Sequence, residues 1–223
     1  MPGQASGVTI ICFSANASIL AGIALLGIGA ITVRRAKSWT QLPYAAIPVA
    51  FGLQQMVEAY LWKALPVQSP TADVATTVYL LFSHVLWPIL VPLAVLLIEP
   101  VAARRKLLLA PMAAGSVAAV AFLIALFTAP VSALIEGKHI AYHLPHRHQA
   151  AILTLYIIGT CLAPLLSSHK TVRYFGIAIT VALIASWAAY LNWFASVWCF
   201  FAALMSGLIW LHFSQRRPSG NPT

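Results

Sequence analysis

The sequence predicts an all-α protein, a polytopic bundle of seven transmembrane helices. Two observations lead to this fold class. Of the 223 residues, 61% are hydrophobic and only 8% are charged, whereas a soluble domain carries about 25% charged residues. The basic residues also fall in short clusters that separate long apolar segments. Because this small number of charges cannot cover a globular surface, we expect most of the surface to contact a lipid bilayer.

Each predicted span is close to the roughly 20 residues that cross about 30 Å of hydrocarbon. The spans cover residues 9–33, 43–65, 76–98, 107–129, 149–167, 174–191 and 194–213. Only Asn192 and Trp193 separate the last two, which predicts a tight turn there. The chain is expected to form one seven-helix domain over residues 1–214, followed by a short disordered cytoplasmic tail at 215–223.

The basic residues predict the orientation of these spans. Ten of the thirteen follow an odd-numbered span: Arg34, Arg35, Lys37, Arg104, Arg105, Lys106, Lys170, Arg173, Arg216 and Arg217. The positive-inside rule then places the N-terminus outside and the C-terminus inside, as in a multi-pass protein of the cytoplasmic (inner) membrane. Because the basic clusters form no continuous stripe, the net charge of +9 does not predict a nucleic-acid partner.

Glu58 is one of only four acidic residues, and it lies inside the second predicted span. A carboxylate at that depth costs about 2.5–3.5 kcal/mol on insertion scales. Such residues usually face the interior of a bundle and mark a functional site. The alternative is a protonated structural carboxyl that bonds to a neighbouring Gln or Tyr.

With the orientation set, several other polar side chains fall at the depth of Glu58, in the outer half of the membrane. The candidate ligand-binding residues are Glu58, His84, Asn16, Gln54 and Tyr190, and the candidate metal ligands are Glu58, His84, Cys12 and Cys199. Together they predict a polar pocket that opens toward the outer surface. Each has a simpler alternative, because a core histidine, a packed cysteine and a helix-bridging amide need no ligand.

The pocket predicts a binding site for an unknown small ligand or a transition metal. Cysteine, histidine and carboxylate together suit zinc or copper. One alternative function is a proton-coupled small-molecule transporter in which Glu58 titrates. Another is a membrane-embedded hydrolase with Glu58 or His84 as base and Ser14 or Cys12 as nucleophile. A purely structural or assembly role is the remaining alternative.

Three further local predictions concern the backbone and the loops. Pro88 and Pro92 lack N–H groups, so carbonyls near Ser83 and His84 need other donors. Glu99 is expected to form an interfacial ion pair with Arg104 or Arg105, which contributes little energy. The loop at 130–148 contains four of the seven histidines, and we expect either a solvated loop or, if it is helical, a metal shared by His139 and His143.

Four segments carry a resemblance to a known family. They are Cys-Phe-Ser-Ala-Asn-Ala-Ser at 12–18, Gln-Gln-Met-Val-Glu-Ala-Tyr-Leu-Trp at 54–62, Leu-Trp-Pro at 86–88 with Pro92, and Phe-Ala-Ser-Val-Trp-Cys-Phe-Phe-Ala-Ala at 194–203. With these segments the chain resembles an uncharacterised family of bacterial integral membrane proteins. The resemblance implies a protein with several spans and implies no activity.

Overall fold

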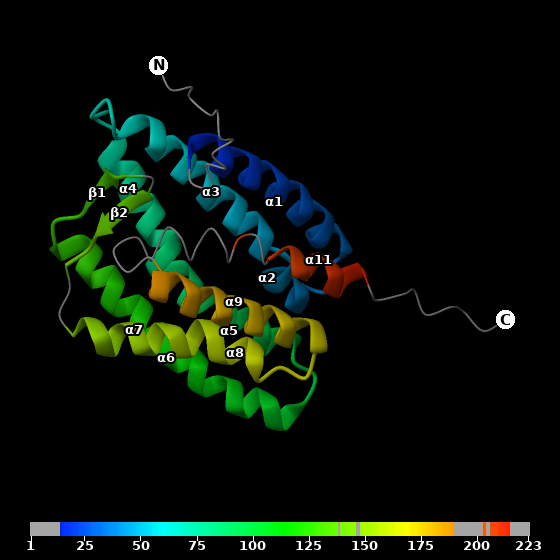
Figure 1. Cartoon of the computed structure of the whole chain (residues 1–223). Helices are drawn as coiled ribbons and strands as arrows, with labels where there is room; N and C mark the ends of the chain where they lie inside the picture. Colours follow the sequence, from blue (N-terminus) through cyan, green and yellow to red (C-terminus); the bar gives the residue numbers. More distant parts are fainter. Residues whose placement is uncertain (1–13, 138, 146–147, 190–202, 204–205, 215–223) are drawn as a thin grey trace, which may run out of the picture.

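The computed structural model describes residues 14–137, 139–145, 148–189, 203 and 206–214. These residues are mostly helical, as the sequence predicts, with one small sheet (Figure 1). The elements are α1 (Ala15–Arg35), η1 (Trp39–Gln41), α2 (Leu42–Ala45), α3 (Ile47–Ala64), α4 (Ala72–Leu80), η2 (Leu81–Leu86), α5 (Trp87–Ile98), α6 (Ala102–Thr128), β1 (Ser132–Glu136), β2 (His139–His143), α7 (Gln149–Ile157), η3 (Ile158–Leu162), α8 (Ala163–Leu165), α9 (Lys170–Ala189) and α11 (Gly207–Ser214).

Three helices within the described residues are long and apolar enough to cross a membrane. They are α1, the continuous helix Ala72–Ile98 built from α4, η2 and α5, and α6, with 21, 27 and 27 residues. At 1.5 Å per residue they measure about 32–40 Å, which exceeds the roughly 30 Å of a hydrocarbon core. They correspond to the first, third and fourth predicted spans. The predicted turn at Asn192 and Trp193 lies outside the described residues.

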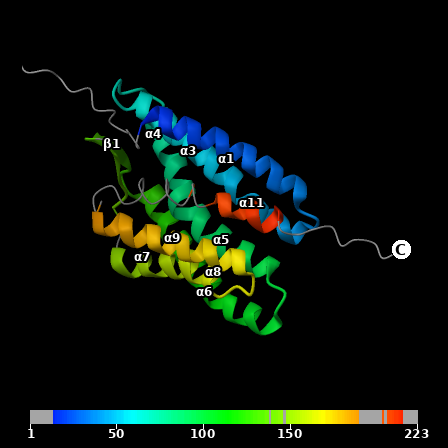
Figure 2. The ribbon, with the colours of Figure 1, turned by 45° about the vertical axis from the view of Figure 1, so that its right-hand side comes forward.

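Small residues let these helices approach closely. A Cβ added to Gly115 of α6 would collide with the carbonyl oxygen of Pro88, and one added to Gly159 of η3 would lie 2.8 Å from the Gly115 Cα. In lipid, where apolar side chains gain little by leaving the solvent, such backbone contact is a main source of helix association. The main core spreads over all the long helices, and α11 packs between α1 and α9 (Figure 2).

The loop at 130–148 differs from both expectations, because much of it forms an antiparallel β-hairpin. Ser132 pairs with His143, and Glu136 pairs with His139. Gly137 in the turn has φ of 64°, a left-handed conformation that glycine adopts without steric cost. His139 and His143 therefore lie about 13 Å apart along a strand and cannot share a metal ion as they would on a helix.

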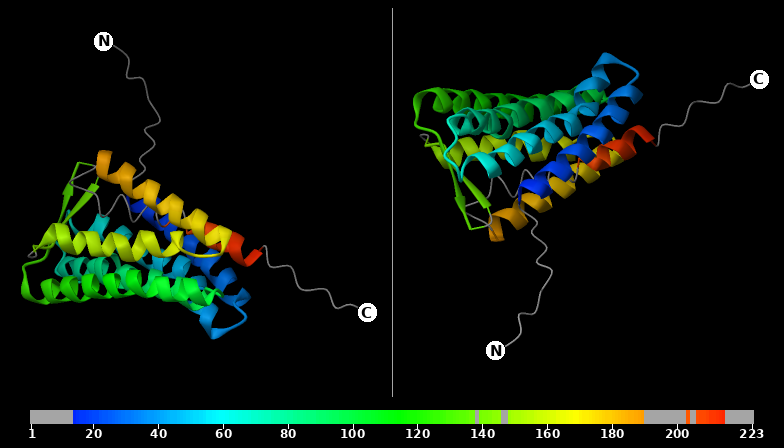
Figure 3. Two further views of the ribbon diagram at one scale, coloured as in Figure 1. Left: turned by 90° about the horizontal axis from the view of Figure 1, so that it is seen from below. Right: turned by 90° about the horizontal axis from the view of Figure 1, so that it is seen from above.

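The hairpin packs on one end of the bundle, which we call the hairpin end (Figure 3). A small apolar cluster, separate from the main core, joins Ala133 and Ile140 of the hairpin to Leu61 of α3 and Tyr79 of α4. The ring of Tyr142 stacks on Tyr79 with centroids 4.2 Å apart. The hairpin thus covers the ends of α3 and α4.

Candidate functional site

One face of α3 carries three polar side chains into the interior. Gln54 and Gln55 are fully buried and Glu58 is 2% exposed. The spacings i, i+3 and i, i+4 put both amides beside the carboxyl on the same face. Gln55 donates its Nε2–H to Glu58 Oε2 over 3.3 Å. The sequence prediction that Glu58 and Gln54 face the bundle interior is therefore correct.

Trp87 of α5 connects to this face from the neighbouring helix. Its indole Nε1–H donates to Gln54 Oε1 over 2.7 Å, and its ring stacks on Phe51 with centroids 3.7 Å apart. Because indole can only donate, this bond fixes which end of the Gln54 amide faces Trp87. The other end, Gln54 Nε2, is buried and has no hydrogen-bond partner among the described residues; the same holds for Gln55 Oε1.

The Gln54–Trp87 bond also sets the level of the residues one turn away. The helix Ala72–Ile98 follows α3 after a short loop and runs antiparallel to it (Figure 1). Glu58 comes four residues after Gln54, and Ser83 comes four residues before Trp87. Because the two helices are antiparallel, one turn forward along α3 and one turn backward along Ala72–Ile98 lead in the same direction. Glu58 therefore lies level with Ser83 and His84, close to the hairpin end.

His84 lies in η2, a π-helical turn between α4 and α5. Its Nδ1 shares a 2.7 Å hydrogen bond with Ser83 Oγ, and its ring meets Phe122 of α6 edge-on, with centroids 4.8 Å apart. The side chain is half-buried. The ring contact directs His84 toward α6, and Glu58 accepts the hydrogen bond from Gln55. Structure and sequence agree on a common level for the two residues.

The backbone at η2 confirms the prediction about carbonyls freed by proline. In a π-turn the N–H of residue 88 would donate to the carbonyl of residue 83, five positions earlier. Pro88 has no N–H, and the Tyr156 hydroxyl of α7 donates to Ser83 O instead, over 2.7 Å. π-turns occur often at functional sites, so the π-turn η2 supports a functional role for the residues around it.

The π-turn also decides which side chains face α3. Over the eight residues from Tyr79 to Trp87, a regular α-helix would drift by about 80°. A π-turn takes up one extra residue and removes most of this drift. Tyr79 belongs to the same small apolar cluster as Leu61 of α3, and Trp87 bonds to Gln54 of α3. Both side chains therefore meet the same helix. Sequence reasoning missed Tyr79, Trp87 and Tyr156, although Trp87 beside Pro88 was a visible signal.

The remaining candidate residues are not brought into this cluster. Asn16 is exposed in the first turn of α1. Cys12, Cys199 and Tyr190 lie outside the described residues. Within the part of the chain that the structure describes, no group of three or more His, Cys, Asp or Glu side chains could hold a metal. Ser14 caps α1 by accepting the Ala17 N–H over 3.3 Å, which gives its hydroxyl a structural role.

A second buried carboxylate lies at the opposite end of the bundle, where the sequence predicted a weak surface ion pair. Glu99 is fully buried at the end of α5. Its Oε1 accepts the Val101 N–H over 3.2 Å, and its Oε2 accepts the Ser168 N–H over 2.8 Å and the Ser167 hydroxyl over 3.1 Å. We call these residues the Glu99 cluster. Burial raises the pKa of Glu99, but these hydrogen bonds outweigh it, so the pKa lies below its usual value.

The expected ion pair of Glu99 is wrong, because the two arginines bind carbonyls instead. Arg105 donates Nε–H to the backbone oxygen of Glu99 over 2.6 Å. Arg104 donates to Leu166 O over 2.8 Å and to Ser167 O over 3.2 Å. Backbone carbonyls at helix ends have no intrahelical donors. Both arginines donate to such carbonyls and not to the Glu99 carboxylate.

The fold and the buried polar cluster define a class: mostly helical proteins with several membrane-length helices that enclose polar side chains. Residues 11–223 match a family of unknown function (DUF6629), and the chain belongs to that family. This confirms the resemblance to an uncharacterised family. Neither the curated proteins nor the solved structures gave a match.

Proposed function

We propose that the protein crosses the inner membrane of a bacterium seven times, with its N-terminus outside and its C-terminus inside. The three membrane-length helices and the placement of ten basic residues after odd-numbered spans support this topology. Under it, the hairpin end faces outward. A green fluorescent protein fused to the C-terminus should fluoresce and an alkaline phosphatase fused there should be inactive. The reverse pattern would contradict the topology.

We propose that the cluster of Gln54, Gln55 and Glu58 binds a small polar ligand. The observation that carries this proposal is the pair of buried amide atoms, Gln54 Nε2 and Gln55 Oε1, without partners among the described residues. Each such atom costs about 1–3 kcal/mol when it stays unsatisfied. Native proteins keep few of them, and a bound ligand or water usually explains those that occur. Both amides lie beside the buried Glu58 carboxyl, and a ligand bound there would satisfy the two amide atoms.

The unpaired atoms define the chemistry of this ligand. Gln54 Nε2 needs an acceptor, and Gln55 Oε1 needs a donor. A small alcohol or amino alcohol supplies both through its hydroxyl group. The zinc or copper version of the site needs the sulfur ligands Cys12 and Cys199, since carboxylate and amide oxygens alone favour harder cations. Transport driven by Glu58 would use the same cluster.

Ligand-induced stabilisation of the detergent-purified protein tests this proposal. The probes are ethanolamine, glycerol and zinc chloride, each added separately. A probe at 100 times its Kd stabilises the folded state by about 2.7 kcal/mol. We expect at least one probe to raise the melting temperature of the wild type and of Gln149→Leu, which changes an exposed glutamine. The same probe should not stabilise Gln55→Leu.

The result that would overturn the proposal is equal stabilisation of Gln55→Leu and the wild type, or no stabilisation by any probe. The zinc version has its own readout, the metal content of the purified protein. Stoichiometric zinc that Cys12→Ser and His84→Ala remove would establish a metal site. Zinc far below stoichiometry, or zinc unchanged by both substitutions, would exclude it.

A further inference from the structure

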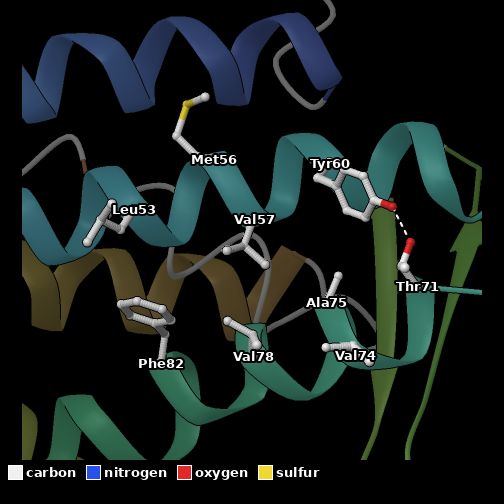
Figure 4. A pocket seen from close by; sticks show the side chains of 9 residues that line it. All are labelled: Leu53, Met56, Val57, Tyr60, Thr71, Val74, Ala75, Val78 and Phe82. Carbon is white, nitrogen blue, oxygen red and sulfur yellow. Dashed lines mark hydrogen bonds between the residues drawn. The ribbon is translucent and has the colours of Figure 1, made fainter.

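Two apolar grooves of similar size run along the surface of the helix Ala72–Ile98. The first has a volume of about 550 Å³ and lies between α3 and the α4–η2 segment (Figure 4). Its lining residues are Leu53, Met56, Val57, Tyr60, Thr71, Val74, Ala75, Val78 and Phe82. The second, of about 500 Å³, follows η2 and α5. We call them the α3–α4 groove and the α5 groove.

Only the α3–α4 groove has a polar end. There the Tyr60 hydroxyl bonds to Thr71 Oγ1, which also bonds to Ser69 Oγ over 2.9 Å. Figure 4 shows the Tyr60–Thr71 bond at one end of the groove, with only apolar side chains along the rest. The α5 groove is lined by apolar side chains alone: Leu81, Phe82, Val85, Leu86, Ile89, Leu90 and Leu93.

One exposed positive charge lies beside this polar end. Lys63 follows Tyr60 by three residues, so the two side chains share a face of α3. Asp73, in the first turn of α4, lies two residues after Thr71 and therefore on another face of the helix than the groove lining. The α3–α4 groove thus leads from an apolar channel to a group of hydroxyls with one positive charge beside it.

The surroundings of the groove determine what fills it. One wall belongs to Ala72–Ile98, which is long and apolar enough to span a membrane. The lining side chains are open to the surroundings; Val74, for example, is 64% exposed. In a bilayer the material beside this wall is an acyl chain, and the polar end lies where the helix leaves the hydrocarbon.

We propose that the α3–α4 groove is a specific binding site for one phospholipid. An acyl chain lies along the apolar lining. The phosphate receives hydrogen bonds at the Tyr60–Thr71 end and lies near the charge of Lys63. Hydroxyls and a lysine are ordinary phosphate ligands.

Native mass spectrometry of protein extracted from vesicles of equal parts phosphatidylethanolamine and phosphatidylglycerol tests this. The wild type should retain one phospholipid. Val78→Trp fills the α3–α4 groove and should lose it, whereas Ile89→Trp, the matched change in the α5 groove, should keep it. Tyr60→Phe removes one hydrogen bond, worth about 1 kcal/mol, and should weaken retention about fivefold.

Two results would overturn the proposal. They are no retained phospholipid in the wild type and equal loss of the phospholipid in the two tryptophan variants. If Val78→Trp does not fold, unchanged lipid retention by Tyr60→Phe would overturn the proposal instead. The small-ligand site at Glu58 is independent of this groove, so Gln55→Leu should still retain the lipid.

Discussion

Glu58 and Glu99 are both buried carboxyls, yet their surroundings differ. Glu99 presents two oxygens to three donors that belong to backbone and serine, and both neighbouring arginines cap helix ends. Glu58 lies between two amides, each with one buried atom that no described residue satisfies. The helix rise places the two carboxyls roughly 25 Å apart along the bundle.

The difference separates a structural role from a binding role. A fully matched polar network holds chain segments together, and the Glu99 cluster joins the end of α5 to the loop before α9. An incompletely matched cluster reduces stability unless a ligand completes it. Buried charge alone therefore does not identify a site. The unmatched amide atoms beside Glu58 and the matched donors around Glu99 distinguish the two cases.

The largest expected effect is a loss of stability when Glu99 is replaced by Gln, and the same replacement at Glu58 is the comparison. Glu99→Gln must place an NH₂ group against at least one donor, because both carboxylate oxygens accept hydrogen bonds. We expect a loss of about 2–3 kcal/mol in the free energy of unfolding, at about 1–3 kcal/mol for each broken bond. Glu58→Gln still accepts the bond from Gln55 and should change this free energy by less than about 1 kcal/mol. Unfolding in mixed detergent measures both.

The comparison fails if Glu58→Gln destabilises as much as Glu99→Gln, since Glu58 would then be as structural as Glu99. Asp73→Asn is the control, an exposed acid in the first turn of α4. Its loss should stay below about 1 kcal/mol, the usual contribution of a charge near a helix end.

A smaller effect is expected at the bond between Gln54 and Trp87. Gln54→Leu leaves the indole N–H buried without an acceptor and should cost about 1–3 kcal/mol. Replacing both partners with apolar residues is often nearly neutral, so Gln54→Leu with Trp87→Phe should recover much of the loss. Unfolding of the two single variants and the double variant gives a coupling energy of about 1 kcal/mol. A coupling near zero would mean that the bond does not link α3 to α5.

The smallest effect is a difference in acid sensitivity between the two ends. Burial lowers the pKa of His139 in the hairpin, which pairs in register with Glu136. As the pH falls, His139 binds a proton in the unfolded chain at a higher pH than in the folded chain. The folded state therefore loses stability as the pH falls below about 6.5. The pKa of Glu99 is also lowered, and its contribution is complete above the unfolded value near 4.3 and lost below it.

Hydrogen exchange at pH 7, 5.5 and 4 measures this difference. Relative to the intrinsic exchange rate at each pH, the hairpin should lose protection between pH 7 and 5.5, and the loop around Ser168 only near pH 4. His139→Gln should remove the first change, whereas His143→Gln, an exposed histidine on the same strand, should keep it. Simultaneous opening of both ends would contradict independent clusters.

Part of the site could be predicted from the sequence. A carboxyl among apolar residues, with amides at helical spacing, was sufficient to place Gln54 and Glu58 inside. Proline spacing was sufficient to predict a carbonyl without a donor near Ser83. Partners from distant segments were not predictable, because Trp87 and Tyr156 reach the site only through the π-turn and the packing of α7. The role of Glu99 was missed because its donors, Ser167 and Ser168, lie on a loop nearly 70 residues away.

The sequence by itself determined the helical class, the membrane-length helices and the interior position of Glu58, because hydrophobicity and helical periodicity are local properties. Tertiary structure alone decided that the histidine-rich loop forms a hairpin over one end. It also decided that Glu99 is matched by loop donors, whereas the amides beside Glu58 are not. Hydrogen-bond matching depends on which distant segments meet, and that information appears only when the helices pack.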